Sequence, residues 1–168
     1  MLTFLRFAGL LNASIWMGAA VFFTLGAGPA FFSDDMASIL PKSHAGAAAQ
    51  IVLQRYLWFH LVCGLIALIH LLVEWLYSGR PLSLFSTGLV SGMLVVSAAG
   101  AFGLLPKMGK LHRQIYSPQN TTEEIAAARR SFGLWHGVSQ AANLGLLGGI
   151  LVHLWTTSKD PKARRFFL

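Results

Sequence analysis

The chain has 168 residues, of which 55% are hydrophobic and only 11% are charged, about half the charged fraction of a typical soluble domain. Its net charge is +7, and because no soluble basic face is present, the cations suit anionic headgroups better than nucleic acid. Four long apolar stretches exclude a soluble protein and predict a single all-α domain. We expect an antiparallel bundle of four transmembrane helices in a lipid bilayer.

The first stretch covers residues 4–32 and is too long for the core of a signal peptide, so we interpret it as a retained helix. Gly28 and Pro29 are expected to kink or end this helix, because proline lacks a backbone donor. Gly18 and Gly26 lie eight residues apart, a spacing that favours close approach of a neighbouring helix. Asn12 is the polar residue expected inside, hydrogen-bonded to a neighbouring helix.

The second span, residues 55–77, belongs to a helix that is expected to begin well before the membrane. One stripe along it follows steps of three and four residues and includes ionisable side chains: His60, Cys63, Ala67, His70 and Glu74. The first two helices run antiparallel, so Arg6 and Glu74 share a depth. We expect an ion pair between them.

The third span, residues 82–105, follows a predicted tight turn at residues 79–81. Gly88 and Gly92 form a GxxxG pattern, which predicts that their face packs closely against another helix. Beyond Pro106 the apolar stripe continues while Lys107 and Lys110 appear, so this helix is expected to extend beyond the bilayer.

The fourth span, residues 131–157, is expected to end a single rod that begins about two turns outside the membrane, at a capping box formed by Thr121 and Glu124. His136, Ser139 and Asn143 fall at i, i+3 and i+7, so they share one face of the helix. Polar groups in hydrocarbon need partners, so this face is expected to point into the bundle.

Several landmarks recur along the chain. Pro29 and Pro106 are 77 residues apart, as are Trp58 and Trp135, and His60 and His136 are 76 apart. These spacings fit two hairpins arranged as a parallel repeat, or two similar hairpins that share landmarks by chance, and both interpretations stay open. In either case the second and fourth helices cross in the same direction.

Because each histidine follows a tryptophan expected at the membrane interface, we predict that His60 and His136 face each other across the interior. Ser139 and Asn143 are expected in the same pocket, and His70 is a further candidate for cofactor binding. Histidines on facing helices hold haem b, and imidazole also binds transition metals. The alternative is that both imidazoles only hydrogen-bond to carbonyls, Ser139 or Asn143.

The segment from His136 to Gly145 resembles the signature of the last helix of the small four-helix proteins named after transmembrane protein 205. The segment from Tyr56 to His60 and the Gly- and Phe-rich first helix are similar to that family too. The resemblance implies a membrane bundle without a settled activity, at most a role in handling metal drugs. Residues 14–18 resemble the first helix of copper-resistance and protoporphyrinogen-oxidising membrane families, whose histidine is replaced here by Asn12.

The residues favour a binding or accessory membrane protein, one small subunit of a larger membrane assembly or a self-associating one. An electron-transfer or oxidoreductase protein with haem or metal at His60 and His136 is the alternative, and transport of a metal or small molecule by an oligomer is another. The sequence contains no nucleophile–base pair, phosphate loop or paired membrane carboxylates, which disfavours an enzyme. Basic residues are balanced between the two ends, so the orientation in the membrane stays open.

Overall fold

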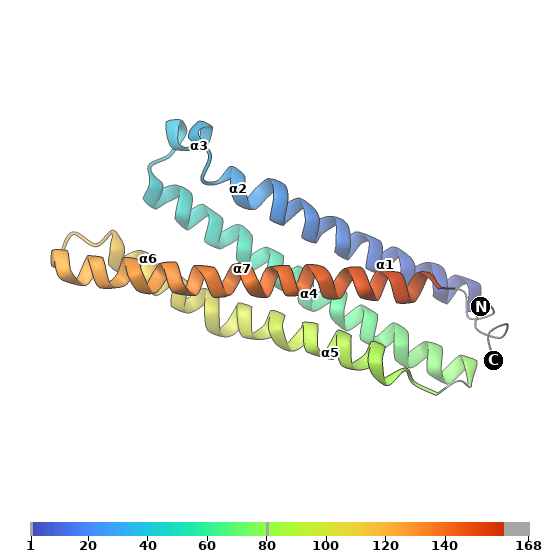
Figure 1. The fold of residues 1–168 in the computed structure, drawn as a ribbon. Coiled ribbons are helices and arrows are strands. Elements are labelled where there is room, and N and C mark those ends of the chain that lie inside the picture. Colours follow the sequence, from blue (N-terminus) through green and yellow to red (C-terminus); the bar gives the residue numbers. More distant parts are fainter. Residues whose placement is uncertain (1, 80, 160–168) are drawn as a thin grey trace.

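The computed structural model describes residues 2–79 and 81–159, and contains no β-strand within them. Its helices are α1 (Leu2–Phe22), the π-helical segment η1 (Phe23–Ala27), α2 (Gly28–Ala30), α3 (Asp34–Ile39), α4 (Lys42–Ser78), α5 (Leu84–Ala99), the π-helical segment η2 (Gly100–Leu104), α6 (Leu105–Ile115) and α7 (Thr122–Ser158). These helices form four long rods, namely α1 to α2, α4, α5 to α6, and α7 (Figure 1). The prediction of an all-α fold is confirmed.

The four rods are long and apolar enough to cross a membrane, which makes this a multi-pass membrane protein. They cover Thr3–Ala30, Lys42–Ser78, Leu84–Ile115 and Thr122–Ser158. The beginning of α1 and the end of α7 lie at one end of the bundle, and α3 and the α6–α7 connection lie at the other, called here the α3 end (Figure 1). Consecutive rods are antiparallel, so α4 and α7 run in the same direction.

Local sequence signals set the ends of these helices. The Thr121 hydroxyl accepts a hydrogen bond from the Glu124 amide at 3.3 Å, and the Glu124 carboxylate accepts one from the Thr121 amide at 2.8 Å. This confirms the predicted capping box at the start of α7. The end of α4 is fixed by Gly79, whose φ of 64° is a conformation that glycine adopts at little cost. Arg80 in the predicted turn lies outside the described residues.

The rods pack in a ring in which α1 and α5 each contact both α4 and α7. The buried core between them consists of Trp16, Ala20, Cys63, Ala67, Val90, Met93, Leu146 and Ile150. Asn12 donates a hydrogen bond from Nδ2 to the Cys63 carbonyl at 3.0 Å, which confirms its expected role between helices. Many large apolar side chains on the outside are exposed, as a surface in contact with lipid requires.

The first rod of each hairpin has the same internal construction. Segments η1 and η2 begin 77 residues apart, and Pro29 and Pro106 follow them at that same separation. The inward faces also match at 77 residues, because Ala13, Trp16 and Ala20 correspond to Val90, Met93 and Ser97, all of which are buried. A shared π-helical interruption and a shared buried face support the parallel repeat over chance similarity.

The second rods follow a different register from the one the landmarks suggested. Their buried residues match at a separation of 83, with Ala45, Cys63 and Ala67 on α4 corresponding to Ala128, Leu146 and Ile150 on α7. Between matched positions of the two rods the second half therefore has six more residues, because α6 lengthens its first rod while the connection itself is shorter. In this register His60 corresponds to Asn143 and not to His136. The equal spacing of tryptophans and histidines does not mark equivalent positions.

The predicted contact at Gly88 and Gly92 is wrong. Both residues are exposed, and a methyl group built at either one would meet no atom within 4 Å, which is also true at Gly18. The inward face of α5 is set by Val90 and Met93, and the two glycines lie on the other side of the helix. Glycines do permit close contacts elsewhere: a methyl group at Gly64 would lie 2.8 Å from a methyl carbon of Leu94.

Candidate functional site

Three rods meet at a group of hydrogen-bonded side chains in the bundle interior. The Tyr56 hydroxyl donates to the Asn143 Oδ1 at 2.7 Å, and Asn143 Nδ2 donates to the Thr24 hydroxyl at 2.8 Å. Thr24 donates in turn to the Ala20 carbonyl at 2.7 Å, and Phe23 stacks on Tyr56 with ring centroids 4.0 Å apart. These groups satisfy one another, so Tyr56, Asn143 and Thr24, called here the inner triad, are stable within the apolar interior.

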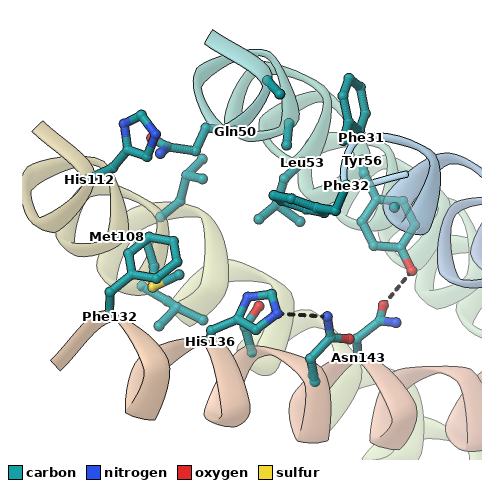
Figure 2. A pocket seen from close by; sticks show the side chains of 18 of the residues that line it. Phe31, Phe32, Gln50, Leu53, Tyr56, Met108, His112, Phe132, His136 and Asn143 are labelled. Atoms are coloured by element: carbon teal, nitrogen blue, oxygen red, sulfur yellow. Dashed lines mark hydrogen bonds between the residues drawn. The ribbon is translucent and has the colours of Figure 1, made fainter. Parts of the chain in front are cut away.

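A cavity of about 780 Å³ extends from the inner triad toward the α3 end. In Figure 2, Phe31, Phe32 and Tyr56 border one side of it, and α7 borders the other with Phe132, His136 and Asn143. The first rod diverges from α7 toward the α3 end (Figure 1), and its π-helical segment and Pro29 border the cavity. The walls are mostly apolar, and a volume of this size is in the range of pockets that hold small molecules.

The polar lining residues of the cavity carry no negative charge. The cations are Lys42 on α4 and Arg129 on α7, and the lining residues include no aspartate or glutamate. Other polar side chains line the cavity as well, among them Gln50, His112, His136, Ser139 and Gln140. The electrostatic potential of the cavity therefore favours an anionic or neutral polar group over a cationic one.

Two polar side chains of the lining are held at the contact between α4 and α6. Gly46 makes room for the His112 ring, since a methyl group there would lie 2.5 Å from His112 Nε2. Gly109 makes room for Gln50 in the same way, at 3.0 Å from Oε1. Within the described residues Gln50 Nε2 and His112 Nε2 are buried without a hydrogen-bond partner, a costly state that a nearby acceptor relieves.

The cavity extends from the apolar part of α7 to the charged parts of α4 and α7 at the α3 end. Helices α4 and α7 each have 37 residues, which corresponds to about 55 Å at 1.5 Å per residue, against a hydrocarbon core of ~30 Å. Both therefore extend beyond the membrane, and at the α3 end they carry the charged residues that precede the apolar stretches. Asn143 lies within the apolar part of α7, whereas Lys42 and Arg129 lie in the extensions.

Three of the predicted site residues share this cavity, and two histidines are elsewhere. His136, Ser139 and Asn143 line it, but His60 is not among its lining residues. His60 is fully buried and accepts a hydrogen bond at Nδ1 from Trp16 Nε1 at 3.0 Å. His136 is exposed, stacks on Phe132 with centroids 6.2 Å apart, and lies 3.4 Å from Gln140.

The prediction that His60 and His136 face each other is therefore wrong. Tyr56 and Asn143 are hydrogen-bonded and mark one level. His60 lies four residues beyond Tyr56 on α4 and His136 seven residues before Asn143 on α7, so the two histidines lie on opposite sides of this hydrogen bond along the bundle. Haem or metal held between these two imidazoles loses its geometric basis. In the part of the chain that the structure describes, no group of three or more metal-binding side chains is found.

His70 has a structural role at the other end of the bundle. Its Nε2 bonds to the Leu5 carbonyl at 2.9 Å, and Gly9 leaves the space that its ring fills. This contact brings the start of α1 beside the last turns of α4. Arg6 and Glu74 belong to these same turns, and their ion pair stays a prediction.

Sequence reasoning missed a second cluster of buried polar residues. Trp16 is fully buried, and its ring lies edge-on to both His60 and His153, with centroid distances of 5.8 and 6.2 Å. His153 lies ten residues after Asn143, on the buried face of α7 that includes Leu146. That helical spacing was the available signal for His153. Gln50 and His112 gave no such signal, because they lie outside the apolar stretches.

Residues 11–117 match the family model described as a domain of unknown function, DUF4149. The chain belongs to the DUF4149 family. No curated protein and no solved structure matches it. The matched range includes most of α1 and all of α4, α5 and α6, so the α4 and α6 walls of the cavity belong to the DUF4149 region. The wall formed by α7 lies beyond it.

Proposed function

We propose that this DUF4149 protein binds an amphipathic small molecule in the cavity. The apolar part of the ligand lies toward the inner triad, and its polar part lies at the α3 end. The observation that carries this proposal is the continuity of one cavity from Asn143, within the apolar part of α7, to Lys42 and Arg129 beyond it.

The distribution of polar groups supports this orientation. At the inner end, Tyr56, Asn143 and Thr24 use their hydrogen-bonding capacity on one another. At the outer end, Gln50 and His112 each have an unpartnered nitrogen among the described residues. A ligand that is apolar at one end and polar at the other meets this arrangement without burying an unsatisfied group at either end.

The proposal makes the protein a binding or accessory protein of the membrane, in keeping with the function favoured by the sequence. Beyond DUF4149 membership, a relationship to the proteins named after transmembrane protein 205 is also part of this proposal. It rests on the segment from His136 to Gly145, which includes five residues of the cavity wall and lies beyond the matched DUF4149 range. Membership of a larger assembly is also part of the proposal.

The test uses two neighbouring alanines on α7. Ala142 lines the cavity, whereas Ala141 is exposed and is not a lining residue. Ala142→Trp is expected to fill the cavity, and Ala141→Trp adds the same side chain to the outside. Each protein is purified in detergent, and amphipathic molecules that remain bound are extracted and quantified by mass spectrometry. We expect about one equivalent with the wild type and with Ala141→Trp, and a large loss with Ala142→Trp. Equal retention by both variants would refute the proposal.

A further inference from the structure

We infer that the polar end of the ligand is an oxyanion, and that the ligand is a lipid whose phosphate is held between Lys42 and Arg129. This inference rests on the proposed binding function and specifies the ligand class. Its first support is charge: both charged side chains that line the cavity are cations, and no lining residue is acidic. Asp34 and Asp35 on the adjoining α3 are exposed and do not line it.

The two cations lie toward the same end of the cavity, on different rods. Tyr56 on α4 and Asn143 on α7 are joined by a 2.7 Å hydrogen bond, which places their side chains at a similar height on these two parallel helices. Lys42 precedes Tyr56 by 14 residues, and Arg129 precedes Asn143 by the same number. Each therefore lies about 21 Å along its own helix from the inner-triad residue of that helix. An anion between them is attracted from both sides.

The distance from the cations to the inner triad suits a lipid. One lipid leaflet occupies half of the ~30 Å hydrocarbon core. The rise of about 21 Å along the helices exceeds this leaflet depth. A phosphate at the level of Lys42 and Arg129 therefore places its acyl chain along the apolar walls down to Asn143. A free phosphate would use the outer end alone and leave this apolar volume unfilled.

The state of the two cations also supports an anionic partner. Among residues 2–79 and 81–159, neither Lys42 nor Arg129 forms an ion pair with an acidic side chain, and both are exposed. Gln50 and His112 line the same cavity, and each has a buried nitrogen without a hydrogen-bond partner among the described residues. Guanidinium, ammonium and amide donors together form the set that proteins use for phosphate.

The test compares lipids that differ only in their headgroup. Dioleoyl phosphatidic acid, dioleoyl phosphatidylcholine and dioleoylglycerol are offered in detergent at equal mole fractions to the full-length protein, and the retained lipid is measured by native mass spectrometry. We expect phosphatidic acid to be retained about tenfold more than either of the others, the ratio that one charge-assisted contact provides. The double variant Lys42→Gln/Arg129→Gln is expected to reduce this preference to near unity.

The matched control is Lys110→Gln/Arg130→Gln, which removes two exposed cations that do not line the cavity, and its preference is expected to be unchanged. Equal retention of all three lipids, with loss in Ala142→Trp, would overturn the phosphate inference and leave the binding function standing. Retention of none of the three would overturn the lipid inference, and the comparison of Ala142→Trp with Ala141→Trp would then decide the binding function separately. Inorganic phosphate at the same concentration is expected not to displace the lipid; displacement would show a free oxyanion site and refute the lipid.

Discussion

At the scale of single residues, the cavity has two kinds of polar side chain. Asn143 uses both ends of its amide, accepting from Tyr56 at 2.7 Å and donating to Thr24 at 2.8 Å. Gln50, also an amide, has a buried nitrogen without a partner among the described residues. The first kind joins helices and the second is available to a ligand. Membrane helices gain about 0.6 kcal/mol on average from one such interhelical hydrogen bond.

The inner triad therefore gives a first prediction, which concerns stability. Asn143→Leu removes two interhelical hydrogen bonds and leaves the Tyr56 hydroxyl buried without its acceptor. We expect a loss of about 1–2 kcal/mol in the free energy of unfolding. Unfolding by dodecyl sulfate in mixed micelles measures it. The control is Gln140→Leu, which affects only a 3.4 Å contact with His136. Equal stability of the two variants would show that the inner triad does not join the rods.

At the scale of helices, packing at glycines differs between positions that look alike in the sequence. Gly64 is buried on α4, and a methyl group there would lie 2.8 Å from Leu94 and 3.3 Å from the Trp16 ring. Gly88 is exposed on α5 and has open space around it. Gly64→Ala is expected to cost about 1–3 kcal/mol by overpacking. Gly88→Ala is expected to be neutral or to gain up to ~1 kcal/mol from helix propensity.

Thermal unfolding of both variants in the same detergent distinguishes these outcomes. If Gly88→Ala lowers the unfolding temperature more than Gly64→Ala does, the helix faces described here are wrong. The test applies directly to the GxxxG pattern, whose spacing was the basis for the wrong expectation.

The same comparison shows which helical features a sequence reveals. The capping box at Thr121 and the turn at Gly79 were predictable, because each depends on side chains within a few residues of one another. The face of α5 was not predictable from Gly88 and Gly92. In an apolar helix both faces are hydrophobic, so periodicity cannot say which side meets protein and which meets lipid. That choice depends on Val90 and Met93 finding partners on other rods.

At the scale of the whole molecule, the relative height of α4 and α7 determines which of the predicted site residues lie together. His136, Ser139 and Asn143 were predictable as one face, because their spacing is a property of α7 alone. Their pairing with His60 depended on the relative height of two rods. That height depends on the number of residues between the two rods of each hairpin, which differs between the hairpins, and interfacial tryptophans report it only to within several residues. The hydrogen bond between Tyr56 and Asn143 is the direct measure, and it places His60 below the cavity.

The last prediction concerns the charge and accessibility of the cavity as a whole. Ser139 lines the cavity at a depth within the apolar part of α7, between Arg129 and Asn143. In a background with Cys63→Ala, which removes the sole native thiol, a cysteine at Ser139 is expected to react with water-soluble thiosulfonates. The same substitution at Ala141, which is exposed on the outside of the rod, is expected to be shielded by detergent or lipid.

The anionic sulfonatoethyl reagent is expected to react several-fold to about tenfold faster than the cationic trimethylammonium-ethyl reagent, because the described lining residues include cations and no acidic residue. The ratio should fall toward unity in 1 M salt, where the Debye length is about 3 Å. A cysteine at Ser158, at the opposite end of α7, corrects for the intrinsic reactivities of the two reagents. Faster reaction of the cationic reagent at Ser139 would contradict the electrostatics of the cavity, and no reaction at Ser139 while Ser158 reacts would contradict its opening to water.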